Sequence, residues 1–209
     1  MSQRLFTNAS RPGRGVSAGG SGALPAGWES LAVALGANLG DPAATLVAVR
    51  PLLEQLLQPL APQGACRWSP LFRTAPVGGP PDQPDYLNAV LLLGPLQGDP
   101  QPQGLLEALQ DLERRFGRER RERWGPRLLD LDLLWCGERV LRGEPLELPH
   151  PRLAGRAFVL APLAAIDPAL VPPLPDQPPR SCGERLEDLL ALGEEPPPLR
   201  LPPQPGWPE

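Results

Sequence analysis

The chain of 209 residues contains no lysine, and all 20 of its basic side chains are arginine. This absence excludes a P-loop phosphate site, which needs the lysine of its glycine-rich motif, and it excludes the lysine-dependent chemistry of protein kinases and imine-forming enzymes. Any anion that the protein binds must therefore be bound by guanidinium groups, backbone amides or a metal ion.

Histidine and cysteine are also scarce. His150 is the single histidine, so a zinc site with several imidazole ligands is excluded. The three cysteines, Cys66, Cys136 and Cys182, are odd in number and widely spaced, which predicts reduced thiols in a cytoplasmic protein. No run approaches the roughly 18 consecutive apolar residues of a membrane-spanning helix, so we expect no membrane association.

Glycine and proline are frequent but unevenly distributed. Residues 1–27 combine glycine, serine, alanine and arginine without an acidic residue, and they predict a disordered tail; the lack of an apolar face argues against a transit peptide. Residues 28–170 alternate apolar runs with polar turns over a length suited to one globular domain. Residues 171–209 form a proline-rich extension to which the sequence assigns no activity.

Hydrophobic patterning within the domain predicts an α+β fold. The apolar run at 31–35 indicates a buried strand, and Asp41 followed by Pro42 is typical of a helix start. Further strands are predicted at 65–74, 86–93 and 129–136, and a second helix at 103–116, whereas the Gly- and Pro-rich loop 75–84 should be exposed. The order β-α-β-β-α-β is that of the ferredoxin-like fold, an antiparallel sheet with helices packed on one face.

Positive charge is concentrated between residues 114 and 127, where seven arginines stand against two glutamates in a protein of net charge −4. Because the rest of the chain is acidic, this segment favours a site for a small, highly charged anion over a general nucleic-acid surface. Gly117, Gly125 and Pro126 argue against a continuous helix here. We therefore predict an arginine-rich loop.

Asp130 and Asp132 follow this loop within an apolar strand. The two-residue period of a strand directs both carboxylates to one face and Leu129, Leu131 and Leu133 to the other. Two neighbouring carboxylates raise each other's cost of ionisation, and a hard divalent cation relieves it, which favours oxygen-ligated Mg²⁺. Mg²⁺ beside guanidinium groups is the arrangement that phosphoryl transfer needs.

The segment 123–132 (RWGPRLLDLD) resembles the signature of the 6-hydroxymethyl-7,8-dihydropterin pyrophosphokinase family. Other segments agree with that family in order and spacing: 36–41 (GANLGD), 69–74 leading to 83–88 (QPDYLN), and 149–153 (PHPRL) leading to 156–158. The resemblance covers residues 30–170. It implies a ferredoxin-like enzyme of folate biosynthesis that transfers diphosphate from ATP to the pterin hydroxymethyl group and releases AMP, with two Mg²⁺ ions as cofactors.

The resemblance also implies roles for individual residues. Asp130 and Asp132 would bind both metal ions, Arg118 and Arg120 would lie in a catalytic loop that closes over the triphosphate, and Arg127 would lie near the phosphates. The positions that contact ATP in the family are Gln110, Glu113, Arg127, His150 and Arg156. The positions that bind the pterin are Thr74, Val77, Tyr86, Asn88, Trp124 and Phe158, where Tyr86 and Phe158 sandwich the ring and Trp124 covers the site after closure.

Helical spacing gives a further expectation for Gln110 and Glu113, which should lie together on the surface of their helix, away from its apolar stripe. Asn38 and Asp41 are expected to shape the first turn and cap the first helix. Pro151 stands where some members of the family have an aromatic residue, which puts nucleotide stacking there in doubt.

Two alternatives remain open. One is a non-catalytic nucleotide-binding module on a ferredoxin-like fold, which the intact aspartates and arginines argue against. The other is a nucleic-acid-binding module, which a single tyrosine and a negative net charge argue against. The sequence leaves the oligomeric state open.

Overall fold

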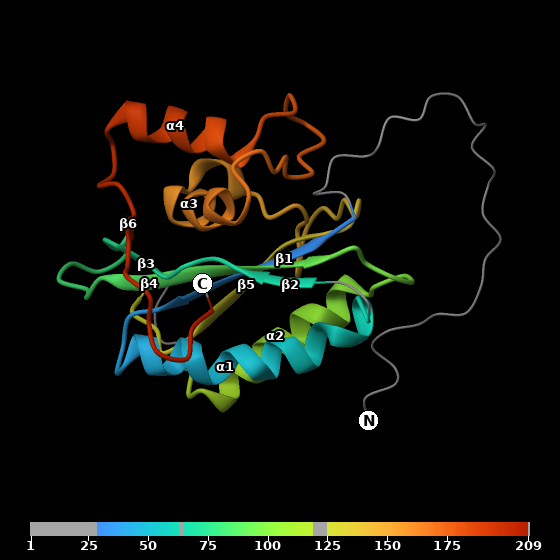
Figure 1. Cartoon of the computed structure of the whole chain (residues 1–209), viewed down its shortest axis with the longest axis horizontal. Helices are drawn as coiled ribbons and strands as arrows, with labels where there is room; N and C mark the ends of the chain where they lie inside the picture. Colours follow the sequence, from blue (N-terminus) through green and yellow to red (C-terminus); the bar gives the residue numbers. More distant parts are fainter. Residues whose placement is uncertain (1–28, 63–64, 119–124, 209) are drawn as a thin grey trace.

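In the computed structural model, which describes residues 29–62, 65–118 and 125–208, one sheet lies between two layers of helices (Figure 1). Helices α1 (Pro42–Leu57) and α2 (Pro102–Arg115) cover one face. Helix α3 (Ala157–Ile166) covers the other face, and α4 (Cys182–Leu192) packs on the outer side of α3. No helix among the described residues is long and apolar enough to cross a membrane.

The sheet is antiparallel and its strands follow the order β5-β1-β4-β3-β6, with β2 also paired to β4. The strands are β1 (Leu31–Ala37), β2 (Ala65–Trp68), β3 (Phe72–Thr74), β4 (Tyr86–Gly94), β5 (Asp130–Cys136) and β6 (Leu199–Arg200). Short 3-10 helices occupy Gln58–Leu60 and Leu153–Gly155. The predicted β-α-β-β-α-β order is confirmed, with α1 and α2 on one face; α3 and α4 were not part of the prediction.

The strand predicted at 65–74 is interrupted at residues 69–71. Pro70 has no N–H to donate to the ladder, and the Ser69 side chain takes part in the pairing instead, because its hydroxyl accepts the Val90 N–H at 2.9 Å. The Ser69 N–H still donates to the Val90 carbonyl at 3.0 Å. The chain therefore bends and restarts as the three-residue strand β3.

The first helix begins where the sequence predicts. Asp41 is its N-cap, since the side chain accepts the Ala44 N–H at 3.0 Å, and Pro42 follows. Apolar residues of α1, α2 and the facing side of the sheet form one core. A second core lies between the opposite side of the sheet and α3, which is apolar on every side because the sheet and α4 enclose it.

Residues 171–208 fold onto the domain. Helix α4 starts with a capping box between Ser181 and Glu184 and ends at Gly193, whose positive φ of 67° suits glycine. The chain then adds β6 to the edge of the sheet, and Trp207 joins the core between the sheet and helices α1 and α2. The proline-rich extension is thus joined to both helical layers.

Candidate active site

A cavity of about 790 Å³ opens at one end of the sheet, on the side of α3. The end of β1 and the starts of β4 and β5 meet there because these neighbouring strands are antiparallel. The predicted residues that line it are Thr74, Val77, Tyr86, Asn88, Arg127, Asp130, Asp132, His150, Arg156 and Phe158. Residues separated by more than 80 positions in the sequence are therefore brought into one pocket.

The two aspartates of β5 lie side by side in this cavity, while Leu131 and Leu133 pack into the opposite core, as the alternation predicts. Arg127 donates to Asp130, and Arg118 Nη1 lies 2.8 Å from Asp130 Oδ1. Arg156 Nη1 lies 3.8 Å from Asp132 Oδ2. Burial and the charge of Asp130 raise the pKa of Asp132. Three arginines thus surround the two carboxylates, and burial still disfavours the charged form of Asp132.

Arg127 is fixed by its backbone as well as by its side chain. The Arg127 N–H donates to Asn38 Oδ1 at 2.7 Å, and the Asn38 N–H returns a bond to the Arg127 carbonyl at 3.0 Å. The Asn38 amide also donates to the Pro84 carbonyl at 3.1 Å. Asn38 is 3% exposed. It shapes the first turn, as expected, and it also joins that turn to the loops before β4 and β5.

On the β4 side of the cavity, next to the aspartates, polar groups are arranged beside two aromatic rings. Asn88 Nδ2 donates to Thr74 Oγ1 at 2.7 Å, and both residues are buried. Gly36 makes room for this pair, because a methyl group on it would lie 2.9 Å from Asn88 Oδ1. Tyr86 and Phe158 line the same region. This end therefore offers both aromatic faces and amide or hydroxyl groups.

His150 is a partly buried residue of the cavity wall. Its Nδ1 accepts the Arg152 N–H at 3.2 Å, so the ring closes a local turn and a proton on Nε2 is available to donate. Burial, together with the charges of Arg156 and Arg152, lowers the pKa of His150 to about 4. His150 is therefore neutral at pH 7.

Glu113 does not lie on the surface of its helix, so that part of the prediction is wrong. The residue is 2% exposed, and its carboxylate accepts the Leu131 N–H at 2.7 Å and pairs with Arg118. These partners come from β5 and from the segment that follows α2, and the helical spacing alone does not reveal them. Glu113 thus hydrogen-bonds to β5, the strand that carries the two aspartates. Burial raises the pKa of Glu113 to about 7.

Replacing Glu113 with glutamine should change how stability depends on pH. The carboxyl group has a higher pKa in the folded than in the unfolded protein, so its contribution to the free energy of unfolding is present below about pH 4.5 and is lost as the pH rises through about 7. Glutamine stays neutral. We expect the melting temperature of Glu113→Gln relative to the wild type to rise by roughly 5 °C across this range.

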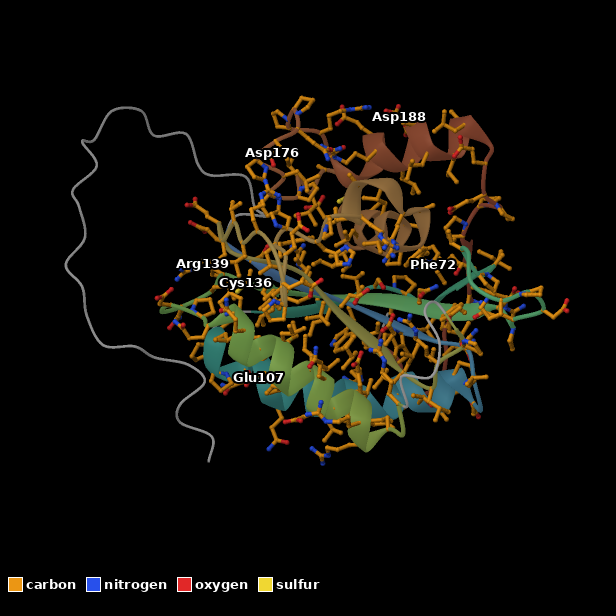
Figure 2. All side chains as sticks on the ribbon, turned by 180° about the vertical axis from the view of Figure 1, so that it is seen from behind. Phe72, Glu107, Cys136, Arg139, Asp176 and Asp188 are labelled. Atoms are coloured by element: carbon orange, nitrogen blue, oxygen red, sulfur yellow. The ribbon has the colours of Figure 1, made fainter. Side chains whose placement is uncertain are left out.

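Thermal unfolding measured from pH 4.5 to 8 tests this expectation. Glu107→Gln is the matched control, because Glu107 is an exposed carboxylate on the same helix (Figure 2). A difference between Glu113→Gln and the wild type that stays constant with pH would contradict it.

Some predicted residues lie elsewhere. Gln110 and Glu113 do not line the cavity, whereas Arg118 reaches it through its contact with Asp130. Arg120 and Trp124 are outside the described residues.

The structure adds lining residues that were not predicted. They include Gln83, Arg152 and Gln177. Arg152 belongs to a segment that the family resemblance covers, so it could have been found from the sequence. Gln177 carries no such signal, because it comes from the C-terminal extension and reaches the cavity only through folding.

Comparisons with known proteins show which family the chain resembles. Residues 32–168 match the family model described as 7,8-dihydro-6-hydroxymethylpterin-pyrophosphokinase (HPPK). A 2-amino-4-hydroxy-6-hydroxymethyldihydropteridine pyrophosphokinase from Pseudomonas aeruginosa is 42% identical over 159 residues, which are 76% of this chain and 88% of the relative. The enzyme of the same name from Haemophilus influenzae is 38% identical over 141 residues, 68% of this chain and 83% of the relative.

A solved structure is similar in fold. The chain resembles Plasmodium falciparum HPPK-DHPS, crystallised with pteroate, with a TM-score of 0.53 and 10% sequence identity. The match covers 78% of this chain and 42% of the Plasmodium chain, so the present chain spans less than half of that protein. The extent of the family match and the identity to the bacterial enzymes together show that the chain belongs to the 7,8-dihydro-6-hydroxymethylpterin-pyrophosphokinase family.

Proposed function

We propose that the chain catalyses the transfer of diphosphate from ATP to 6-hydroxymethyl-7,8-dihydropterin in folate biosynthesis, giving the pterin diphosphate and AMP. The observation that carries this proposal is the composition of one cavity. One end offers aromatic rings and amide groups, and the adjoining part holds two aspartates among arginines. A flat heterocycle and a polyphosphate could therefore be held next to each other.

The pterin would bind at the end formed by β3, β4 and the start of α3. Tyr86 and Phe158 would contact the faces of the ring, as aromatic residues commonly do with flat heterocycles. Asn88 and Thr74 have the donors and acceptors that its amide-like edge requires, and their mutual hydrogen bond already orients them. Val77 lies in the exposed loop beside them and would contribute mainly through its backbone.

ATP would bind toward His150 and Arg156. Arg156 and Arg127 provide guanidinium groups, which form paired hydrogen bonds with phosphate oxygens and stay charged at every physiological pH. Neutral His150 can donate a hydrogen bond without adding charge. Contacts of Gln110 and Glu113 with ATP stay predictions, as does the covering of the site by Trp124.

The donor set of the cluster suits Mg²⁺. Asp130 and Asp132 supply hard carboxylate oxygens on one face of β5, and such oxygens are the ligands that Mg²⁺ prefers. The described residues contain no group of three or more His, Cys, Asp and Glu side chains that could hold a metal ion. Two carboxylates that share Mg²⁺ with substrate phosphates match this composition, and we propose two ions.

Bound Mg²⁺ would neutralise phosphate charge, and the protein's own side chains would bind and align the phosphates. Arg118, Arg127 and Arg156 now pair with the aspartates, and they become available to phosphate oxygens once cations compensate the carboxylates. Arg120 would act with Arg118 in the arginine-rich loop. Catalysis would then rest on alignment and electrostatic stabilisation, with water excluded from the triphosphate.

Product analysis tests the proposed function. The protein, incubated with ATP, Mg²⁺ and 6-hydroxymethyl-7,8-dihydropterin, should release one AMP for each pterin diphosphate formed, and chelation of Mg²⁺ should stop the reaction. Release of ADP would contradict diphosphate transfer. Nucleotide binding without AMP release would support the non-catalytic module instead.

A further inference from the structure

Residues 194–208, which we call the C-terminal strap, connect the two helical layers. The strap leaves α4 on one side of the sheet, passes the edge of the sheet at β3, and ends against α1 on the other side (Figure 1). Near its end, Gly206 approaches α1 so closely that a methyl group on it would lie 3.0 Å from Val47 Cγ1. The family match ends at residue 168, so the strap lies outside it.

The strap is bonded along the outer edge of β3. Strand β6 pairs with β3 through Phe72 opposite Arg200 and Arg73 opposite Leu199. One step further, the Leu201 N–H donates to the Leu71 carbonyl at 2.8 Å. The interrupted segment between β2 and β3 thereby gains a backbone partner on its open side.

Trp207 holds the segment between β2 and β3 from the α1 side of the sheet. It is 7% exposed, and its indole N–H donates to the Ser69 carbonyl at 2.8 Å. Its ring meets Trp68 edge to face, with 5.1 Å between ring centroids. Trp68 is itself held by Glu54 of α1, which accepts its indole N–H at 2.8 Å. Trp207 thus links the bend at residues 69–71 to α1.

The strap adds partners to the bend and to β3, which is only three residues long. Two-stranded pairing over so few residues is weak, and Pro70 breaks the continuity with β2. Thr74, the last residue of β3, accepts the Asn88 hydrogen bond inside the cavity. A shift of β3 would therefore move Thr74 and the loop that follows it.

The start of the strap also faces residues 74–78, which form the wall of the main cavity that begins at Thr74. A second cavity of about 310 Å³ lies between residues 74–78 and Phe158 on one side and strap residues Glu194, Glu195, Pro196 and Pro198 on the other. Residues 74–78 thus separate the main cavity from the strap. The strap therefore borders both residues 74–78 and the outer edge of β3.

We propose that the strap positions the wall of the pterin-binding end of the cavity, with Trp207 as its main positioning residue. The hydrogen bond and the ring contact of Trp207 go to Ser69 and Trp68, which we do not place against substrate. Trp207 acts through the bend at 69–71 and β3 on Thr74 and the hydrogen bond to Asn88. This inference rests on the proposed function, because it assigns that end of the cavity to the pterin.

The test compares two tryptophan variants that lose the same kind of bond. Trp207→Phe keeps a ring against Trp68 but removes the donor to the Ser69 carbonyl. Trp135→Phe is the matched control, because Trp135 is fully buried and its indole N–H donates to Ser30 Oγ at 3.0 Å near the opposite end of the sheet. Trp207→Ala is a stronger variant of the first, and Trp207→Phe keeps the test valid if the alanine variant does not fold.

The expected result is selective. Trp207→Phe should raise the KM for the pterin, and the Kd of 6-hydroxymethylpterin measured by fluorescence titration, by about three- to tenfold. The KM for ATP and kcat should stay within about twofold, since no nucleotide contact depends on β3. Trp135→Phe should leave the pterin KM unchanged even where it lowers the melting temperature by a similar amount.

The outcomes separate the two proposals. An unchanged pterin KM in both Trp207 variants, or an equal rise in Trp135→Phe, would overturn the positioning role while leaving the proposed function intact. A wild-type protein that neither binds 6-hydroxymethylpterin nor releases AMP would overturn the proposed function itself.

Discussion

Replacing Asp132 with alanine should reduce the rate of AMP release by about a thousandfold or more, because the cluster would lose one of its two carboxylates and with it the means of holding Mg²⁺ against the phosphates. The protein should remain folded. Burial and Asp130 raise the pKa of Asp132, so the charged form is disfavoured in the folded state, and its removal should not lower the free energy of unfolding at pH 7.

Two measurements on the same preparation, AMP release and urea unfolding, check this result. Asp111→Ala is a suitable control, because Asp111 is an exposed carboxylate on α2 that pairs with Arg114. Activity retained in Asp132→Ala would refute its role as a metal ligand. Activity lost together with stability would show that the residue is structural.

Arg127→Ala should lower kcat/KM for ATP by about a hundredfold, the typical loss when one fixed donor to a reacting phosphate or oxyanion is removed. Arg127→Lys should recover only part of this loss, to about tenfold below the wild type. An ammonium group keeps the charge, but it lacks the planar fork with which arginine can contact Asp130 and a phosphate at once.

Steady-state kinetics with ATP varied at saturating pterin measure both Arg127 variants. Arg139→Lys is the control for arginine replacement as such, since Arg139 pairs with Asp99 at the opposite end of the sheet from Phe72 (Figure 2). Full activity in Arg127→Lys would show that charge alone is needed at this position. Full activity in Arg127→Ala would remove Arg127 from the proposed phosphate site.

Local patterns were sufficient for much of the fold. The start of α1 depends on Asp41 and Pro42, which act within one turn, and the common face of Asp130 and Asp132 follows from the geometry of any strand. Such features need no knowledge of distant residues. For that reason they could be predicted from the sequence and agree with the structure.

Features that depend on distant partners could not be predicted in this way. The position of Glu113 is decided by the Leu131 N–H, 18 residues away, which makes burial of a carboxylate tolerable. The residue that ties Arg127 in place, Asn38, is 89 positions earlier in the chain. Spacing within one helix or turn contains no information about either contact.

The C-terminal extension shows both kinds of signal. The capping box of Ser181 and Glu184 and the terminal Gly193 are local markers of a helix within a segment whose composition is dominated by proline. The contact of Trp207 with Ser69 has no local marker, since it is made across the fold.

That contact joins residues 138 positions apart, which has a consequence for the order of folding during synthesis. Strands β1 to β5 and helices α1 and α2 can assemble on the ribosome as they emerge, because their pairing partners are all present by residue 136. The outer edge of β3 and the bend at 69–71 gain their remaining partners only when β6 and Trp207 have been synthesised. The sheet can therefore form first with an open edge at β3, and the wall that begins at Thr74 is the part of the cavity whose neighbours are completed last along the chain.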